Sequence, residues 1–255
     1  MNKLIIFFLT SLFICSTSLS RNAGETEITT EDGIEVFQEE KYYLLKKNVK
    51  ILSDELELSG QIVKVFFEEG LYDIKKLIAT DTVYFKSDEY NMSGKGNYVD
   101  FDIKNQKIII NGINSELYLE NTEMMSDGKI MVDNLNSSFF INGNNSKLIS
   151  DKIFITGEKI NGSFEIINGK RDVASLIVED DKLLNIKTNN ILMYAKKAVY
   201  DKKKSIIELF EDVKINRGSE IITGDYGILD MKKDSYKVLS NKSNKVKAII
   251  IGSNE

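Results

Sequence analysis

The chain of 255 residues has no histidine, no tryptophan, no proline and a single cysteine. Without histidine it cannot form a Ser-His-Asp triad, a Cys-His dyad or an imidazole metal site. It also has no Gly-Lys-Ser/Thr loop of the kind that holds nucleotide phosphates. These absences exclude most hydrolase, thiol-enzyme and zinc-enzyme mechanisms. We therefore expect a protein that is not an enzyme and has no cofactor or metal.

A large excess of one charge is missing as well. The chain has 34 basic and 39 acidic side chains, for a net charge of -5. Proteins that bind nucleic acid usually carry a basic surplus on one face, so nucleic acid is not an expected partner. With 42% hydrophobic residues, the chain is long enough and apolar enough to bury a core.

The first twenty residues are expected to be a signal peptide. Lys3 provides a short positive start, residues 4–14 form an apolar run, and Ser18 and Ser20 occupy the small-residue positions before a cleavage site. The run is shorter than the roughly 20 apolar residues of a transmembrane helix. The pattern predicts cleavage after Ser20, with an uncleaved membrane anchor as the alternative.

Cleavage would also remove the only cysteine, Cys15. The bulky Phe13 and Ile14 precede it where a lipidation site needs small residues, so lipid attachment is the lesser alternative. The exported chain would lack both cysteine and histidine, which excludes disulfides, thiol catalysis and Cys/His zinc sites. We expect a thiol-free protein exported to the periplasm.

The rest of the chain, from Tyr42 onward, alternates with a period of two. Apolar side chains recur at every second position in short runs, which places them on one face of a β-strand. At one strand per 8 to 12 residues, the length predicts on the order of 20 strands. Four Asn-Gly pairs are typical of tight hairpins and are expected as turns. These pairs are Asn111-Gly112, Asn142-Gly143, Asn161-Gly162 and Asn168-Gly169.

An internal repeat accompanies the alternation. Residues 77–102 align without gaps on residues 176–201; both open on Leu-Ile and close on an aromatic residue followed by Asp. A shorter element recurs at residues 52–56, 149–153 and 222–225. Repeated strand units with similar turns predict a stacked β-architecture. Acidic pairs such as Asp180-Asp181 lack the spacing of a calcium loop and are expected to be solvated turn residues.

Residues 193–239 resemble the C-terminal part of LptA/OstA-like proteins, the periplasmic bridge of lipopolysaccharide transport. Three phrases carry the resemblance: Ala195-Lys-Lys-Ala198-Val-Tyr200-Asp201, the strand from Leu209 to Ile215, and Ile222-Thr-Gly224-Asp225 followed by Asp230. Residues 74–83 resemble an earlier phrase of the family. Asp81 stands there in place of a usual glycine, and Glu211-Asp212 replaces a usual Gly-Asn. The likeness covers residues 48–238 and is weakest between 115 and 170.

The resemblance implies a slightly twisted, open β-jellyroll, an all-β fold of two facing antiparallel sheets with an apolar groove between them. It implies a lipopolysaccharide-binding bridge that carries its ligand from the inner to the outer membrane. The implied partners are lipopolysaccharide, an inner-membrane LptC-like subunit and an outer-membrane LptD-like translocon. Copies of the chain are expected to stack head to tail as a homo-oligomer.

The expected organisation is a signal peptide at 1–20, a linker at 21–41, a first OstA-like β repeat region at 42–160 and a second one, continuous with it, at 161–255. The alternating residues supply the candidates for the lipid-binding groove. They are Val49, Ile51, Leu56, Leu58, Val83, Phe85, Val99, Phe101, Ile108, Ile110, Leu209, Val213 and Ile215.

Other functions stay open on the sequence alone. The membrane-anchored LptC-like subunit of the same pathway shares the fold and would retain the apolar segment at 4–14. A structural β-repeat or adhesin module would polymerise without binding lipid. A hydrolase is the weakest alternative because histidine and cysteine are missing. The absence of proline leaves the terminal strand edges unblocked, as strand addition between copies requires.

Overall fold

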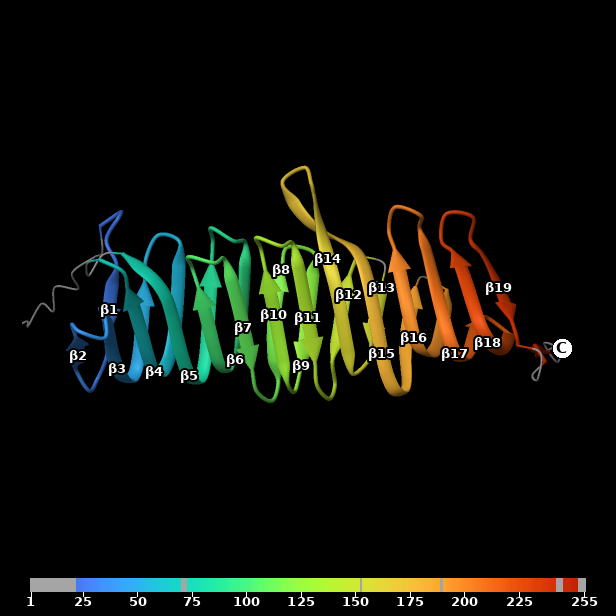
Figure 1. Ribbon diagram of the computed structural model, residues 1–255, viewed down its shortest axis with the longest axis horizontal. Helices are drawn as coiled ribbons and strands as arrows, with labels where there is room; N and C mark the ends of the chain where they lie inside the picture. The colour runs from blue at the N-terminus through green and yellow to red at the C-terminus, as the bar shows by residue number, and fades with distance from the viewer. Residues whose placement is uncertain (1–21, 70–72, 152, 189, 242–244, 252–255) are drawn as a thin grey trace, which may run out of the picture.

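The computed structural model describes residues 22–69, 73–151, 153–188, 190–241 and 245–251. Twenty strands and no helix occur in these segments, and every pairing between strands is antiparallel (Figure 1). The all-β prediction and the expected number of strands are confirmed. The predicted signal peptide lies outside the described residues. The strands are β1 Glu27–Thr29, β2 Ile34–Phe37, β3 Tyr42–Leu52, β4 Leu56–Phe67, β5 Ile74–Ser87, β6 Met92–Asp102, β7 Lys107–Asn111, β8 Ser115–Leu119, β9 Thr122–Ser126, β10 Lys129–Asp133, β11 Ser138–Asn142, β12 Lys147–Ser150, β13 Ile153–Thr156, β14 Lys159–Ile167, β15 Lys170–Thr188, β16 Ile191–Asp201, β17 Ile206–Arg217, β18 Glu220–Asp230, β19 Ser235–Leu239 and β20 Lys247–Ile250.

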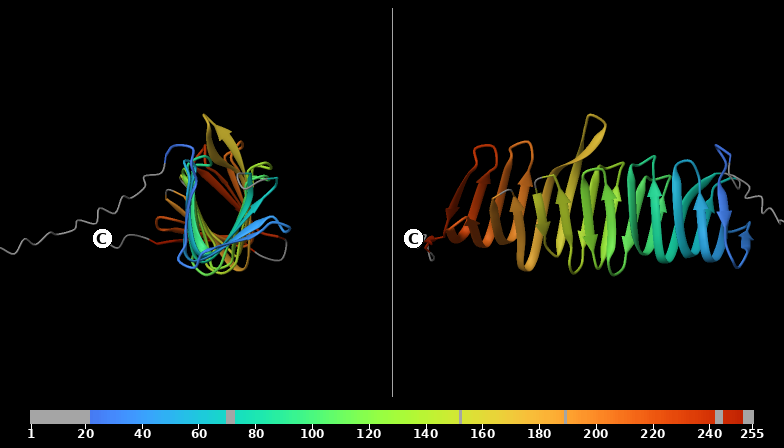
Figure 2. Two further views of the ribbon diagram at one scale, coloured as in Figure 1. Left: turned by 90° about the vertical axis from the view of Figure 1, so that its left-hand side faces the viewer. Right: turned by 180° about the vertical axis from the view of Figure 1, so that it is seen from behind.

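Seen along its long axis, the molecule has a V-shaped section with two walls that meet at a bend (Figure 2). The long strands β3–β6 and β15–β18 run through both walls. Between them, wall A consists of the short strands β7, β10, β11 and β14, and wall B of β8, β9, β12 and β13. One half of β6 pairs with β7 and the other half with β8, so the two walls diverge there. They rejoin at β15, which pairs with both β14 and β13.

Only one of the four Asn-Gly pairs forms a hairpin turn, namely Asn168-Gly169 between β14 and β15. Asn161-Gly162 lies within β14. The other two pairs lie at the bend, where Gly112 (φ 124°) and Gly143 (φ 131°) direct the chain from wall A into wall B. The hairpin prediction is wrong for these three pairs. Asn161-Gly162 continues a strand, and after the other two pairs the next strand joins neighbours in the other wall.

The internal repeat corresponds to two hairpins of the same register. Leu77 of β5 faces Phe101 of β6, and Leu176 of β15 faces Tyr200 of β16. The first two copies of the shorter element lie in wall B, at 52–56 between β3 and β4 and at the paired ends of β12 and β13, whereas its third copy at 222–225 lies within β18. Its resemblance there reflects strand composition rather than a shared turn.

The expected subdivision at position 160/161 falls inside β14, which pairs with both β11 and β15. The sheet is therefore continuous across that position. The expected linker at 21–41 contains two short strands, β1 and β2, which pair with the two halves of β3. Their short length and exposed side chains explain why the alternation there is weak.

The bend places ordinary residues in the left-handed backbone region. Asp81 and Thr82 have φ angles of 64° and 56°, and Glu211 and Asp212 have angles of 62° and 53°. Asp81 and the pair Glu211-Asp212 are the positions where the resembled family usually has Gly and Gly-Asn, respectively. Left-handed backbone costs roughly 1–2 kcal/mol for a residue with a Cβ, and most for β-branched residues such as threonine. Local strain at Thr82 is therefore maintained by the surrounding sheet.

Replacing Thr82 by asparagine should stabilise the protein, because asparagine adopts this backbone conformation more readily. We expect a gain of about 1 kcal/mol, which for a chain of this size raises the melting temperature by about 2–4 °C. Thr80→Asn is the control, since Thr80 lies in the same strand outside the left-handed positions. An unchanged or lower melting temperature for Thr82→Asn in thermal unfolding would contradict the strain at this bend.

Candidate functional site

Each wall presents a row of mostly apolar side chains to the interior, with one residue from almost every strand. Each residue of a row is the register partner of the next one on the neighbouring strand. Each row therefore runs the length of the molecule without interruption. The wall-A ladder is Leu45, Val63, Ala79, Val99, Ile110, Ile130, Ile141, Ile160, Val178, Ala198, Leu209, Gly227 and Val238. The wall-B ladder is Ile51, Leu58, Phe85, Gly94, Leu117, Met124, Leu148, Ile155, Ile186, Met193, Ile215, Ile222 and Ala248.

All thirteen candidate groove residues face this one interior. Five lie in wall A: Val99, Phe101, Ile108, Ile110 and Leu209. The other eight lie in wall B. Twelve of the thirteen are at most 3% exposed, and Leu56 is partly buried against the same core. Lipid contact by these residues remains a prediction.

The candidate set omitted the interior residues of the central short strands, including Leu117, Ile130, Ile141 and Leu148. A signal for them was present in the sequence. Leu117 and Leu119 alternate, as do Ile130 and Val132 in the next part of the chain. These runs are only five residues long, and the bend then restarts the alternation in the opposite wall.

The space between the walls is filled with side chains. Glycines in one strand accommodate large neighbours: a Cβ at Gly94 would lie 2.7 Å from the Phe85 ring, and one at Gly162 would lie 2.1 Å from the Phe139 ring. Near the bend, a Cβ at Gly157 would lie 2.6 Å from Val178 Cγ1 of the opposite wall. The two ladders therefore form a packed apolar interior.

At the side opposite the bend, the turns of the two walls border a mouth. A cavity of about 510 Å³ opens there between the ends of β12 and β13 in wall B and the strands β15 and β16 of wall A. Its apolar lining consists of Leu148, Ile153, Val173, Leu176, Tyr200 and Met231. The interior is thus most accessible where the walls are farthest from the bend.

A lysine lies at the rim of this mouth cavity. Lys202 Nζ lies 3.0 Å from Glu165 Oε1 and also donates a hydrogen bond to Asp172. Burial by itself lowers the pKa of Lys202, but the hydrogen bonds to Asp172 and Glu165 outweigh it, so that the pKa is raised. The rim therefore carries one cation held between two carboxylates.

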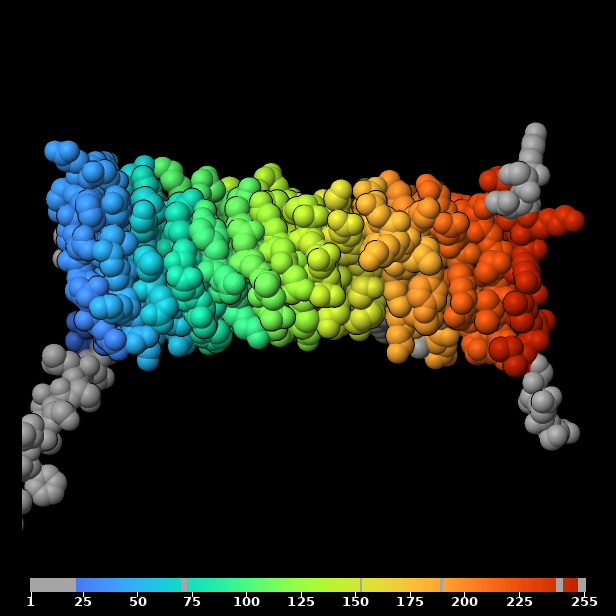
Figure 3. Space-filling view, turned by 90° about the horizontal axis from the view of Figure 1, so that it is seen from below, coloured from blue at the N-terminus to red at the C-terminus, as the bar shows by residue number. Residues whose placement is uncertain are grey.

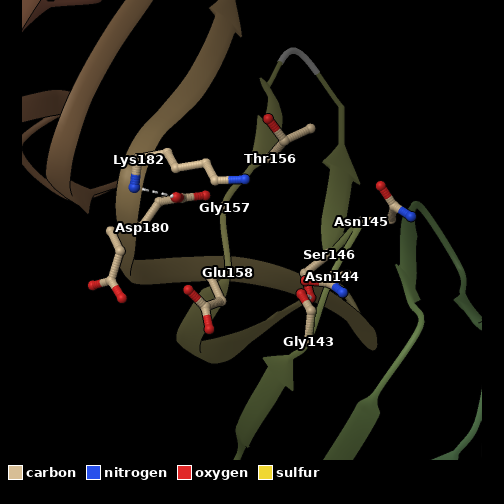
Figure 4. A pocket seen from close by; sticks show the side chains of 10 residues that line it. Gly143, Asn144, Asn145, Ser146, Thr156, Gly157, Glu158, Asp180 and Lys182 are labelled. Carbon is tan, nitrogen blue, oxygen red and sulfur yellow. Dashed lines mark hydrogen bonds between the residues drawn. The ribbon is translucent and has the colours of Figure 1, made fainter.

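Three other hollows lie along the bend and are lined mostly by polar residues. The largest has a volume of about 640 Å³ and includes Glu158, Asp180, Asp181 and Lys182 (Figure 4). The Lys182 backbone N–H donates to Asp180 Oδ1 over 2.8 Å, as in a turn. Within the described part of the chain, no group of three or more acidic, His or Cys side chains is placed to hold a metal.

The molecule is elongated, with the N-terminal and C-terminal strands at opposite ends (Figure 3). These two ends differ in charge. Residues 22–40, at the β1–β2 end, include seven Asp or Glu and no Lys or Arg, whereas the described residues 231–241 and 245–251, at the β19–β20 end, include five Lys and one Asp. Both ends expose apolar side chains, with Ile34 49% and Ile250 75% accessible. No helix in the described segments is long and apolar enough to span a bilayer.

Replacing Ile110 by alanine should destabilise the protein by about 2–5 kcal/mol, because it leaves a cavity in a packed interior. Ile109→Ala is the matched control, since Ile109 points to the outer face of the same strand and is only partly buried. Urea unfolding measures the difference. If the interior were an open, hydrated groove, Ile110→Ala would lower the free energy of unfolding no more than Ile109→Ala does.

A sequence model described as "LptA/(LptD N-terminal domain) LPS transport protein" matches residues 141–235. The sequence matches none of the curated proteins with which it was compared. Among solved structures, it is similar to LptH from Pseudomonas aeruginosa, described as the LptA-homologous periplasmic component of the conserved lipopolysaccharide transport device. That similarity has 10% identity, a TM-score of 0.37, and covers 43% of this chain and 76% of LptH. The match over residues 141–235 agrees with the resemblance to LptA/OstA-like lipopolysaccharide-transport proteins that the sequence predicted.

Proposed function

We propose that the chain is a non-enzymatic periplasmic carrier that holds the acyl chains of lipopolysaccharide between its two walls and forms part of a bridge from the inner to the outer membrane. The observation that supports this most directly is the pair of apolar ladders. Each ladder stays in its own wall. The wall-A ladder runs from β3 to β19, and the wall-B ladder runs from β3 to β20. Such a continuous apolar surface suits hydrocarbon chains, which can be bound by apolar contact without catalytic or charged groups.

The energetics favour hydrocarbon in such a track. Each CH₂ moved out of water contributes roughly 0.8 kcal/mol, so several acyl chains are retained without a charged anchor. Because the interior is packed in this state, the walls must separate or repack when a chain enters. The bend keeps the walls joined, so the separation widens the mouth, where the 510 Å³ cavity already provides a starting volume.

The charge difference between the ends supports head-to-tail stacking. The acidic β1–β2 end of one copy complements the lysine-rich β19–β20 end of another, and opposite charges steer association and set orientation. Among the described strands, β1 and β2 pair only with β3, and β19 and β20 pair only with β18. Such outermost strands suit strand addition. The same two edges are the proposed contacts for an inner-membrane LptC-like subunit and an outer-membrane LptD-like translocon.

A structural β-repeat that polymerises without lipid is the second candidate, and the packed interior favours it. The membrane-anchored LptC-like role depends on whether the segment at 4–14 is retained. N-terminal sequencing of the exported protein decides between an anchor and a cleaved signal. Lipid capture decides between the carrier and the structural repeat.

Direct lipid contact can be tested with a photo-reactive benzoyl-phenylalanine at Phe85, which is fully buried on the inner face of β5. We expect cross-linking to co-expressed lipopolysaccharide from this position. The same probe at Tyr84, which is 44% exposed on the outer face of β5, is the control and should not cross-link. Equal labelling from both positions, or none from a well-folded Phe85 variant, would count against the carrier.

Stacking can be tested by reversing the charge at the basic end. Lys237→Glu/Lys247→Glu should weaken self-association about tenfold at low salt, equivalent to about 1.4 kcal/mol. Glu39→Lys/Glu40→Lys on a second population should restore it in mixed samples. Lys64→Glu/Lys86→Glu, on strands in the interior of the sheet, is the control. Sedimentation velocity measures the association, and equal effects of the terminal and the control reversals would refute a charge-guided end-to-end contact.

A further inference from the structure

The two arginines in the described segments, Arg171 and Arg217, both connect wall A to wall B across the mouth. Most other ion pairs of the molecule join neighbouring strands or turns of a single wall; Lys104 with Glu68, at 2.7 Å, is an example in wall A. A contact across the mouth restricts the one side of the V that the bend does not close. These two arginines therefore differ from the rest of the surface charge.

The first connection begins on the β14–β15 hairpin. Its tip extends beyond its wall: β11 pairs with β14 only as far as Ser163, and β16 pairs with β15 only from Ser175. The register of the hairpin shifts between Ser163 and Phe164. As a result the tip stands over the open side of the V (Figures 1 and 2).

Arg171 attaches this tip to two turns of wall B. Its backbone N–H donates to Glu120 Oε2 over 2.6 Å, and its Nη1 donates to the Tyr90 carbonyl oxygen over 2.8 Å. Nη1 also lies 3.7 Å from Glu120 Oε1, with the two side chains only 18% and 12% exposed. The Tyr90 ring in turn meets the wall-A ring of Phe101 edge-on at 5.7 Å. The contact is thus charged, partly buried and continued by an aromatic pair.

The second connection closes the mouth at the C-terminal end. Arg217, where β17 ends in wall B, pairs with the carboxylate of Asp234 in the β18–β19 turn of wall A. Its Nη1 donates to the Asp234 carbonyl oxygen over 3.2 Å, and its guanidinium lies 6.0 Å from the centre of the Tyr236 ring. Tyr236 of wall A also donates a hydrogen bond to Glu220 of wall B.

We propose that Arg171 and Arg217 are two clasps that gate the passage of an amphiphile with a bulky headgroup along the mouth. The inference rests on the proposed carrier function. Acyl chains can lie in the apolar interior, but a large polar headgroup cannot, so it must project through the mouth. A ligand that moves from one end to the other then has to pass both clasps. A single fatty acid has no headgroup large enough to require their opening.

The clasps can be opened with Arg171→Met/Glu120→Ala and Arg217→Met/Asp234→Ala, and the first can be locked with Glu120→Cys/Arg171→Cys joined by a short bismaleimide. Lys104→Met/Glu68→Ala, which breaks an ion pair within one wall, is the matched control. The readouts are the loading rate of fluorescent lipopolysaccharide and the loading rate of a dansyl fatty acid. Hydrogen exchange at residues 164–173 reports opening of the first clasp without any lipid.

We expect either opened variant to load lipopolysaccharide about tenfold faster, the change that corresponds to loss of one charge-assisted contact. The locked protein should load it at least about tenfold more slowly by the same conversion. Fatty-acid loading should not change in any variant. If lipopolysaccharide binds at a rate that neither opening nor locking alters, the proposed gate is overturned while the proposed carrier function stands. No lipopolysaccharide binding by any variant would overturn both, whereas binding only by the opened variants supports the gate.

Discussion

The structure depends on the burial of one apolar face of a single sheet against itself. A strand with alternating side chains leaves one face that water disfavours, and this chain has no helix in its described part to cover it. Bending the long strands brings the two halves of the same face together. The bend therefore decides the wall arrangement, the two ladders and the position of the mouth.

The bend has its own rules, which differ from those of the strands. In β3, β5 and β17 the inward residues are four apart across the bend, as from Ala79 to Val83, with left-handed residues between them. In β4, β6 and β16 the inward residues are three apart, and the first of the two is small, as Gly96 is before Val99. A spacing of three interrupts the period-two alternation of the strand. The apolar side chains therefore still point to the interior after the chain passes from one wall to the other. A small residue is needed because the walls converge there.

The proposed carrier role and a stable fold make opposite demands on the same interior. Complete packing stabilises the protein, but hydrocarbon entry requires the packed side chains to be displaced. The architecture separates the two demands spatially: the bend joins the walls covalently, strand by strand, while the mouth is closed by a few polar contacts and a partly open cavity. Contacts that hold a mouth are fewer and more exposed than those of the core, and such regions open at lower free energy than the core does.

The period-two alternation in the sequence determined the all-β class, the number of strands and the inward face of each long strand, because a strand's side-chain period depends only on local geometry. Thus Val49, Phe85, Ile110 and Ile215 could be assigned to one apolar face before any pairing was known. The tertiary structure decided that the Asn-Gly pairs at 111–112 and 142–143 cross between walls instead of closing hairpins, since a turn's role depends on which strands lie beside it. It also decided that Arg171, 51 residues from Glu120 and 81 from Tyr90, lies across the mouth from both. No local pattern specifies contacts between residues so far apart.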